Sequence, residues 1–133
     1  MDITMKKIGL SMLLMLAVMS AQADVYQDPV TKVNYEYTPG GNQASVVKSA
    51  DATGDITILS KFSVDGNEYT VTSIGSFAFY GCTSLTSIQF PANLTSIGLG
   101  AFYSCGLTSV TIPKECKFGD ERISNPFMAC TNL

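Results

Sequence analysis

The four cysteines are the residues of this 133-residue chain best suited to metal or redox chemistry. Cys82, Cys105 and Cys130 recur at spacings of 23 and 25 residues, and Cys116 lies outside this series. Zinc sites are typically built from Cys-x-x-Cys pairs and histidines, and the chain contains neither. We therefore expect no metal and no cofactor, and we interpret the three recurring cysteines as a column of small buried side chains. In an exported protein Cys116 could pair with Cys105 or Cys130, and the sequence leaves this open because geometry decides it.

Acid–base and nucleophilic catalysis lack their usual participants. Histidine, the commonest general base near neutral pH, is absent, which excludes Ser-His-Asp and Cys-His catalysis within this chain. The serines and threonines have no neighbouring base, and Asp51, Asp55 and Asp65 do not have the spacing of a calcium loop. These observations predict a protein that is not an enzyme.

Aromatic side chains also recur, and they suggest either a sugar-binding stripe or a packed core. Phe79, Phe102 and Phe127 favour the core, because phenylalanine is so often buried. Tyr80 and Tyr103 each follow one of these phenylalanines and are better candidates for an exposed position.

The recurring residues belong to an internal repeat. Residues 71–82 (VTSIGSFAFYGC) align with residues 94–105 (LTSIGLGAFYSC) at an offset of 23. Residues 85–91 then match residues 107–113 with one residue deleted, and residues 127–133 begin a third copy. A period of about 20–29 residues with an L-x-x-L-x-L core is typical of leucine-rich repeats.

The repeat predicts short strands whose apolar residues point inward. Alternation at Ile88 and Phe90, and at Val110 and Ile112, indicates strands that end at the prolines that follow. Single helical turns are expected at residues 78–80 and 101–103. Because one repeat cannot bury its own apolar face, the copies should stack and share a core. The columns expected to be buried together contain Ile74, Phe79, Cys82, Leu85, Ile88 and Phe90, and Ile97, Phe102, Cys105, Leu107, Val110 and Ile112.

Residues 24–70 differ from the repeats and predict an N-terminal antiparallel β-cap. Residues 33–37 and 44–48 suggest two strands joined by a turn rich in proline and glycine, and residues 56–59 and 69–71 suggest two more. A solenoid needs such a cap, because an open end exposes core and unpaired edge groups. The predicted organisation is therefore a signal peptide over residues 1–23, a cap over 24–70 and repeats over 71–133, two nearly complete and one partial.

The repeat motif resembles the BspA-like leucine-rich-repeat family of secreted or surface bacterial proteins. The resemblance covers about residues 55–133 and is carried by the Thr-Ser-Ile-Gly and Phe-Tyr-x-Cys segments, with the lead-in at residues 65–75. It implies a leucine-rich-repeat solenoid, mainly β, and a role in adhesion or other macromolecular contact.

The strand positions between the inward residues form the candidate partner-binding face. They are Thr86, Ser87, Gln89, Thr108, Ser109 and Thr111. Two to four strands spaced about 4.8 Å apart expose roughly 150–300 Å², whereas a standard interface needs about 800 Å² per partner. Such a face would bind a host or microbial surface protein or a glycan weakly and multivalently, or as part of a longer array. With 8 basic and 11 acidic residues, the chain should not attract nucleic acid.

Both ends of the chain carry further expectations. Residues 6–23 combine two lysines, an uncharged apolar run and Ala-Gln-Ala, which predicts a cleaved signal peptide and an exported protein. At the other end, residues 114–126 interrupt the repeat and the chain reaches Leu133 without a capping segment. We expect self-association through this end, and a truncated repeat fragment with a structural role or none is the alternative function.

Overall fold

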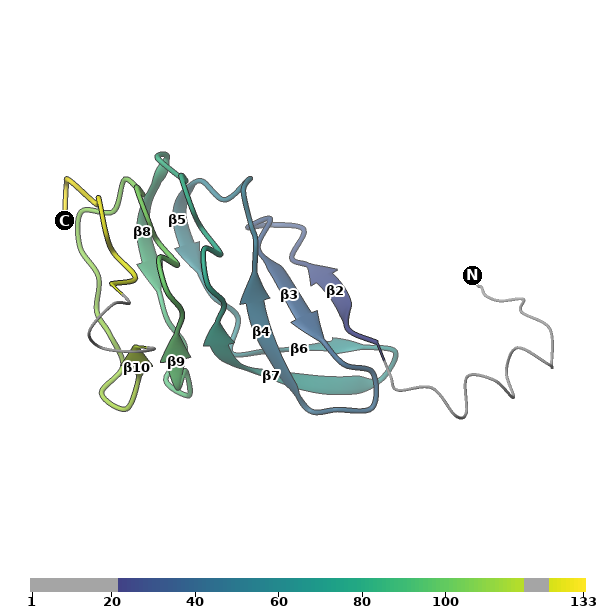
Figure 1. Cartoon of the computed structure of the whole chain (residues 1–133). Helices are drawn as coiled ribbons and strands as arrows, with labels where there is room; N and C mark the ends of the chain where they lie inside the picture. The colour runs from purple at the N-terminus through teal and green to yellow at the C-terminus, as the bar shows by residue number, and fades with distance from the viewer. Residues whose placement is uncertain (1–21, 119–124) are drawn as a thin grey trace.

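The computed structural model describes residues 22–118 and 125–133, and the predicted signal peptide lies almost wholly outside these ranges. The described chain is built from short strands and turns. The strands are β2 Asp24–Gln27, β3 Asn34–Tyr37, β4 Gln43–Val47, β5 Gly54–Thr57, β6 Lys61–Val64, β7 Asn67–Ile74, β8 Leu85–Gln89, β9 Ser96–Ile97 and β10 Lys117–Phe118. The N-terminal strands are followed along the molecule by the stacked coils of a solenoid (Figure 1).

The coils that contain β4 and β7 pass through two sheets, whereas β9 and β10 belong only to the larger one. The larger sheet has the order β10-β9-β7-β4-β3-β2, with β6 also paired to β7, and the smaller sheet joins β5 to β8. Pairing is parallel from β4 through β7 and β9 to β10, and also between β5 and β8. The leucine-rich-repeat solenoid expected from the sequence is therefore the fold of this chain.

Antiparallel pairing is confined to the N-terminal part, as the predicted cap requires. Strands β2, β3 and β4 form an antiparallel meander, and β6 forms a hairpin with β7. Asp65 and Gly66 make the hairpin turn with φ of 50° and 81°, which matches the positive φ that tight hairpins favour at both central residues. Strand β4 nevertheless pairs in parallel with β7, and β5 pairs in parallel with β8. The coils therefore begin to stack before residue 70, the end of the cap predicted from the sequence.

Aromatic packing fills the cap. Tyr26 stacks on Phe62 at a centroid distance of 4.6 Å, and Tyr37 packs on Tyr69 at 4.5 Å. Tyr35 is fully buried, and its hydroxyl accepts a hydrogen bond from the Leu59 amide at 3.0 Å. Burial raises the pKa of Tyr35 to about 12. This hydrogen bond ties the antiparallel strands to the chain leaving β5.

The turns between the two sheets form a third column of hydrogen bonds. Backbone amides of Phe77, Phe79 and Gly81 donate to carbonyls of Leu99, Ala101 and Tyr103 in the next coil, at 2.7–3.0 Å. These segments differ from the single helical turns predicted by sequence. Positive φ at Phe77 and Gly81 reverses the backbone, so each segment consists of consecutive turns closed by i→i−3 bonds.

The core lies between the two sheets and the turn column. Most of the predicted columns are buried: Ile74, Phe79, Cys82, Leu85, Ile88, Ile97, Phe102, Cys105 and Leu107. Phe90, Val110 and Ile112 are only half-buried and pack against its edge. Repeat stacking therefore places equivalent side chains above one another, as expected for a solenoid.

Candidate binding face

The six residues predicted to bind a partner lie on one face, on β8 and on the chain beside it. Five of them are exposed and Ser87 is half-buried. Ile88 is buried and Gln89 is exposed, as strand alternation requires. The pairing of β5 with β8 shifts register between Leu85 and Ser87, and Thr86 at this shift is exposed although Leu85 and Ile88 are both buried. The face is a surface of hydroxyl and amide groups.

Strand β5 extends this face by two residues that the sequence predicts to belong to the cap. Asp55 lies opposite Ser87, and Thr57 lies opposite Gln89. The Thr86 hydroxyl donates a hydrogen bond to the Asp55 carboxylate at 3.3 Å. The apolar alternation of Ile56 and Ile58 resembles that of Ile88 and Phe90 and indicates a strand, but only the tertiary pairing places β5 beside β8.

The strand predicted at residues 107–112 does not form. Its contact with β8 starts with the Thr108 amide donating to the Thr86 carbonyl at 3.2 Å, and no strand ladder follows. Two residues separate Cys82 from Leu85, whereas only Gly106 separates Cys105 from Leu107. Because strand register depends on the length of the preceding turn, we attribute the lost pairing to this shorter connection.

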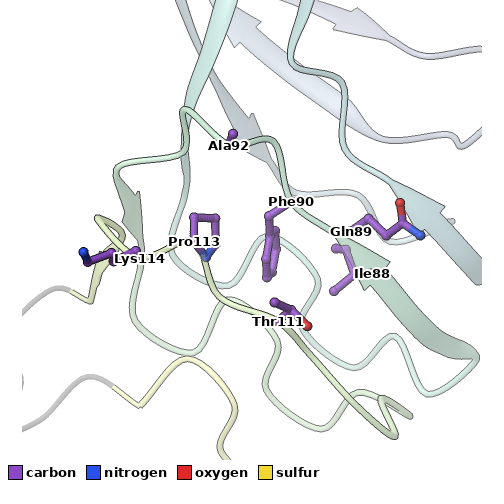
Figure 2. A pocket seen from close by; sticks show the side chains of 7 residues that line it. All are labelled: Ile88, Gln89, Phe90, Ala92, Thr111, Pro113 and Lys114. Carbon is purple, nitrogen blue, oxygen red and sulfur yellow. The ribbon is translucent and has the colours of Figure 1, made fainter.

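A pocket of about 410 Å³ lies at the end of the face, where residues 111–114 pass β8. It is lined by Ile88, Gln89, Phe90, Ala92, Thr111, Pro113 and Lys114. Figure 2 shows the Phe90 ring beside Pro113 and above Thr111, while the Lys114 side chain extends away from Phe90. Two of the predicted residues, Gln89 and Thr111, therefore belong to both the face and the pocket.

The region around the face is electrically neutral. No charged residue occurs from Tyr69 to Pro113, a stretch that contains β8, β9 and both complete turns. Asp55 on one side and Lys114 on the other are the charges that flank the face and its pocket. A neutral surface of this kind favours uncharged groups in a partner, because it offers no compensation for a charge that binding would desolvate.

The recurring cysteines are packing residues that also donate weak hydrogen bonds. The Cys105 thiol donates to the Phe79 carbonyl at 3.0 Å, and the Cys130 thiol donates to the Phe102 carbonyl at 3.0 Å. All four cysteines are free thiols, so Cys116 forms neither of the two disulfides considered above. Within residues 22–118 and 125–133, no three metal-ligating side chains are grouped.

We expect the buried thiol of Cys105 to make the protein less stable in alkali. Burial, and to a smaller extent Cys82 and Cys130, raises its pKa from 9.0 to about 12. The unfolded chain then loses this proton first, so stability is constant below pH 9 and falls as the pH rises toward 12. Between pH 9 and 10 the wild type should lose about 1 kcal/mol more than Cys105→Ala. Urea unfolding at pH 8, 9 and 10 measures this, and parallel curves for the two proteins would contradict it.

The aromatic columns separate as the sequence suggested. Phe79, Phe102 and Phe127 stack at centroid distances of 5.1 and 5.3 Å along the core. Tyr80 and Tyr103 stack outside it at 5.1 Å and 11°, and Tyr80 is 56% exposed. Each of these two rings covers one face of the other, and Phe77 packs against Tyr80 at a steep angle. At most one face of each ring is left for a sugar, so the strand face is the better candidate site.

The comparisons with known proteins agree with this architecture. Residues 57–133 match the family model described as a BspA type leucine-rich repeat region, in six copies. A leucine-rich cell surface protein from Faecalibacterium prausnitzii is 29% identical with a TM-score of 0.62, over 83% of this chain and 29% of that one. A leucine-rich-repeat protein from Bacteroides ovatus is 28% identical with a TM-score of 0.60, over 69% and 25%.

Another solved relative shows the fold alone. A leucine-rich-repeat protein from Bacteroides capillosus is 22% identical with a TM-score of 0.53, over 78% of this chain and 94% of that one. This chain spans less than a third of the length of the first two relatives. No curated protein matches it. No helix among the described residues is long and apolar enough to cross a membrane.

The family match covers more than half of the chain and coincides with the stacked coils, so the chain belongs to the BspA-type leucine-rich repeat family.

Proposed function

We propose that this chain is an exported, adhesion-type interaction module that binds a host or microbial surface protein or glycan. The observation that carries the proposal is the polar face built by β5, β8 and residues 107–112, which is uncharged apart from Asp55 and has a pocket at its end. Its hydroxyl and amide groups are held outward by buried residues of the same strands. One relative with this fold is described as a cell surface protein, which supports display outside the cell.

Binding fits the available side chains better than catalysis does. The chain contains no histidine, and burial raises the pKa of the Cys82, Cys105 and Cys116 thiols. Thiolates, rather than thiols, act as nucleophiles, so these cysteines are poorly suited to covalent chemistry near neutral pH. The face itself presents groups that donate and accept hydrogen bonds without changing charge.

The area of the face limits how tightly one copy can bind. A face of roughly 150–300 Å² is well below the 800 Å² or so that each partner of a standard interface buries. We therefore propose weak contacts that gain strength when several copies or coils act together.

The binding proposal is tested on dense arrays of neutral and sialylated glycans and of purified matrix proteins such as fibronectin, laminin and collagen. Wild-type protein should bind at least one class of probe, and Thr108→Lys should reduce that binding at least 10-fold because it adds a charge to the contact. Thr83→Lys is the matched control, since Thr83 is exposed on a turn outside the face. Equal binding by the two variants, or no binding by the wild type, would contradict the proposal.

Export predicts a defined N-terminus. Strand β2 begins at Asp24, directly after the predicted cleavage site, which is consistent with a folded domain that starts there. Mass spectrometry of protein secreted by a bacterial host should find Asp24 as the first residue. An intact N-terminus in the cytoplasmic fraction would contradict export.

Self-association stays a prediction. Among the described strands, β10 is the last of the larger sheet and pairs with β9 on one side. An edge strand of this kind is a template for another chain.

A further inference from the structure

The main chain of β8 has one satisfied edge and one that is largely open. On the first, the Gln89 carbonyl accepts a hydrogen bond from the Ile58 amide at 3.0 Å, next to β5. On the other, the Thr86 carbonyl accepts from the Thr108 amide. Because main-chain groups alternate along a strand, those of Ile88 and Phe90 point to the same side as those of Thr86, toward residues 107–113.

The expected partners of these groups do not reach them. In the part of the chain that the structure describes, the bond between Thr108 and Thr86 is the only backbone hydrogen bond between β8 and residues 107–113. Beyond it the amides and carbonyls of Ile88 and Phe90 face a segment that has left the ladder. Leaving backbone groups unpaired next to apolar surface is costly, so a partner that pairs the amides and carbonyls of Ile88 and Phe90 would gain hydrogen bonds there.

The pocket lies along this open edge. Its apolar lining comes from Ile88 on β8, from Phe90 directly after that strand, from Ala92 on the following turn and from Pro113 on the neighbouring segment (Figure 2). Phe90 is half-buried and its ring edge packs on Phe102 at 5.7 Å, so the pocket floor rests on the core. A volume of about 410 Å³ is within the range of small ligand sites.

We infer that this edge and pocket receive an extended peptide segment with an apolar side chain. Its main chain hydrogen-bonds to Ile88 and Phe90 in the manner of strand addition, and its side chain enters the pocket between Phe90 and Pro113. The residue that enters is apolar, because four of the seven lining residues are apolar and the one charged lining residue, Lys114, extends its side chain away from Phe90. This inference rests on the proposed binding function and names a protein segment, rather than a glycan, as the partner of the pocket.

Peptide selection and a matched pair of variants test the inference. A display library of random 12-residue peptides is selected against immobilised protein comprising residues 24–133, and enriched sequences are remade as free peptides. They should share one apolar residue in an uncharged stretch. Ala92→Trp, which fills the pocket mouth, should weaken their binding at least 10-fold, whereas Asn93→Trp should not. Asn93 is the neighbouring exposed residue and does not line the pocket.

Hydrogen exchange followed by NMR gives a readout specific to the main chain. Bound peptide should slow exchange of the Ile88 and Phe90 amides at least 10-fold while changing Gln89 little. Failure to enrich peptides, equal binding to Ala92→Trp, or unchanged exchange at Ile88 and Phe90 would overturn the inference. If glycans or matrix proteins then bind in a way that Thr108→Lys abolishes and Ala92→Trp does not, the proposed function stands without the peptide site.

Discussion

Replacing Phe102 by alanine should lower the free energy of unfolding by about 3–5 kcal/mol. Phe102 is completely buried and stacks between Phe79 and Phe127, which belong to the preceding and following coils. Its loss therefore removes packing from both neighbours and leaves a cavity that the stacked backbone cannot readily close. Because small domains are stable by only about 5–15 kcal/mol, this is a large part of the total. Urea unfolding followed by circular dichroism measures the change.

Tyr80→Ala is the control for this experiment. Tyr80 also stacks on an aromatic residue of the next coil, Tyr103, but its side chain is 56% exposed. It should cost about 1 kcal/mol, the order of an aromatic pair at the surface. Similar losses for Phe102→Ala and Tyr80→Ala would contradict a shared core that runs through the phenylalanine column.

The stacked columns could be predicted because they repeat the same residue type at nearly constant spacing. Phe79 and Phe102, or Cys82 and Cys105, gain burial only when one coil lies on another, so their recurrence indicates stacking. The outward direction of Gln89 follows from the alternation of Ile88 and Phe90, whereas Thr86 is exposed at the register shift between β5 and β8. The predicted face was therefore accessible to sequence reasoning, although its binding role stays a proposal.

The part of the face on β5 was harder to predict because its sequence has diverged from the repeat. Residues 54–58 keep the inward alternation of Ile56 and Ile58 and lack the Leu-Thr-Ser motif of the later copies. Their place was decided by parallel pairing with β8, which is a tertiary contact. Asp55 and Thr57 could therefore be placed on a strand from sequence, but not beside Ser87 and Gln89.

The turn conformations were also beyond sequence reasoning. Phe77 has a φ of 57°, a left-handed conformation that is uncommon for a bulky residue, and it aligns with Gly100, whose φ is 56°. A Cβ atom on Gly100 would lie 2.6 Å from the Phe77 ring, so the glycine makes room for that ring. Only the contact between consecutive coils reveals why the two aligned residues differ so much in size.

Gly106→Ala should be among the most destabilising single substitutions, at about 3 kcal/mol or more. A Cβ atom at this position would lie 2.2 Å from the Thr83 carbonyl oxygen and 3.2 Å from its carbonyl carbon. Both are backbone atoms of the preceding coil, so relief requires two coils to move apart. Gly106 is also the single residue between Cys105 and Leu107, where the connection is one residue shorter than in the preceding coil. Urea unfolding gives the loss of stability, and NMR should show shifts at Thr86 and Thr108.

Gly66→Ala separates this steric effect from the backbone cost of replacing a glycine. Gly66 has a φ of 81° and an added Cβ would meet no atom within 4 Å, so the variant should lose only about 1–2 kcal/mol through its left-handed conformation. If Gly106→Ala cost no more than Gly66→Ala, the coils could not be in close contact at Gly106. The short connection would then fail to explain why residues 107–112 leave the ladder after Thr108. The open edge of β8 would then need a different cause, such as the incomplete burial of Val110 and Ile112 in the segment that follows Thr108.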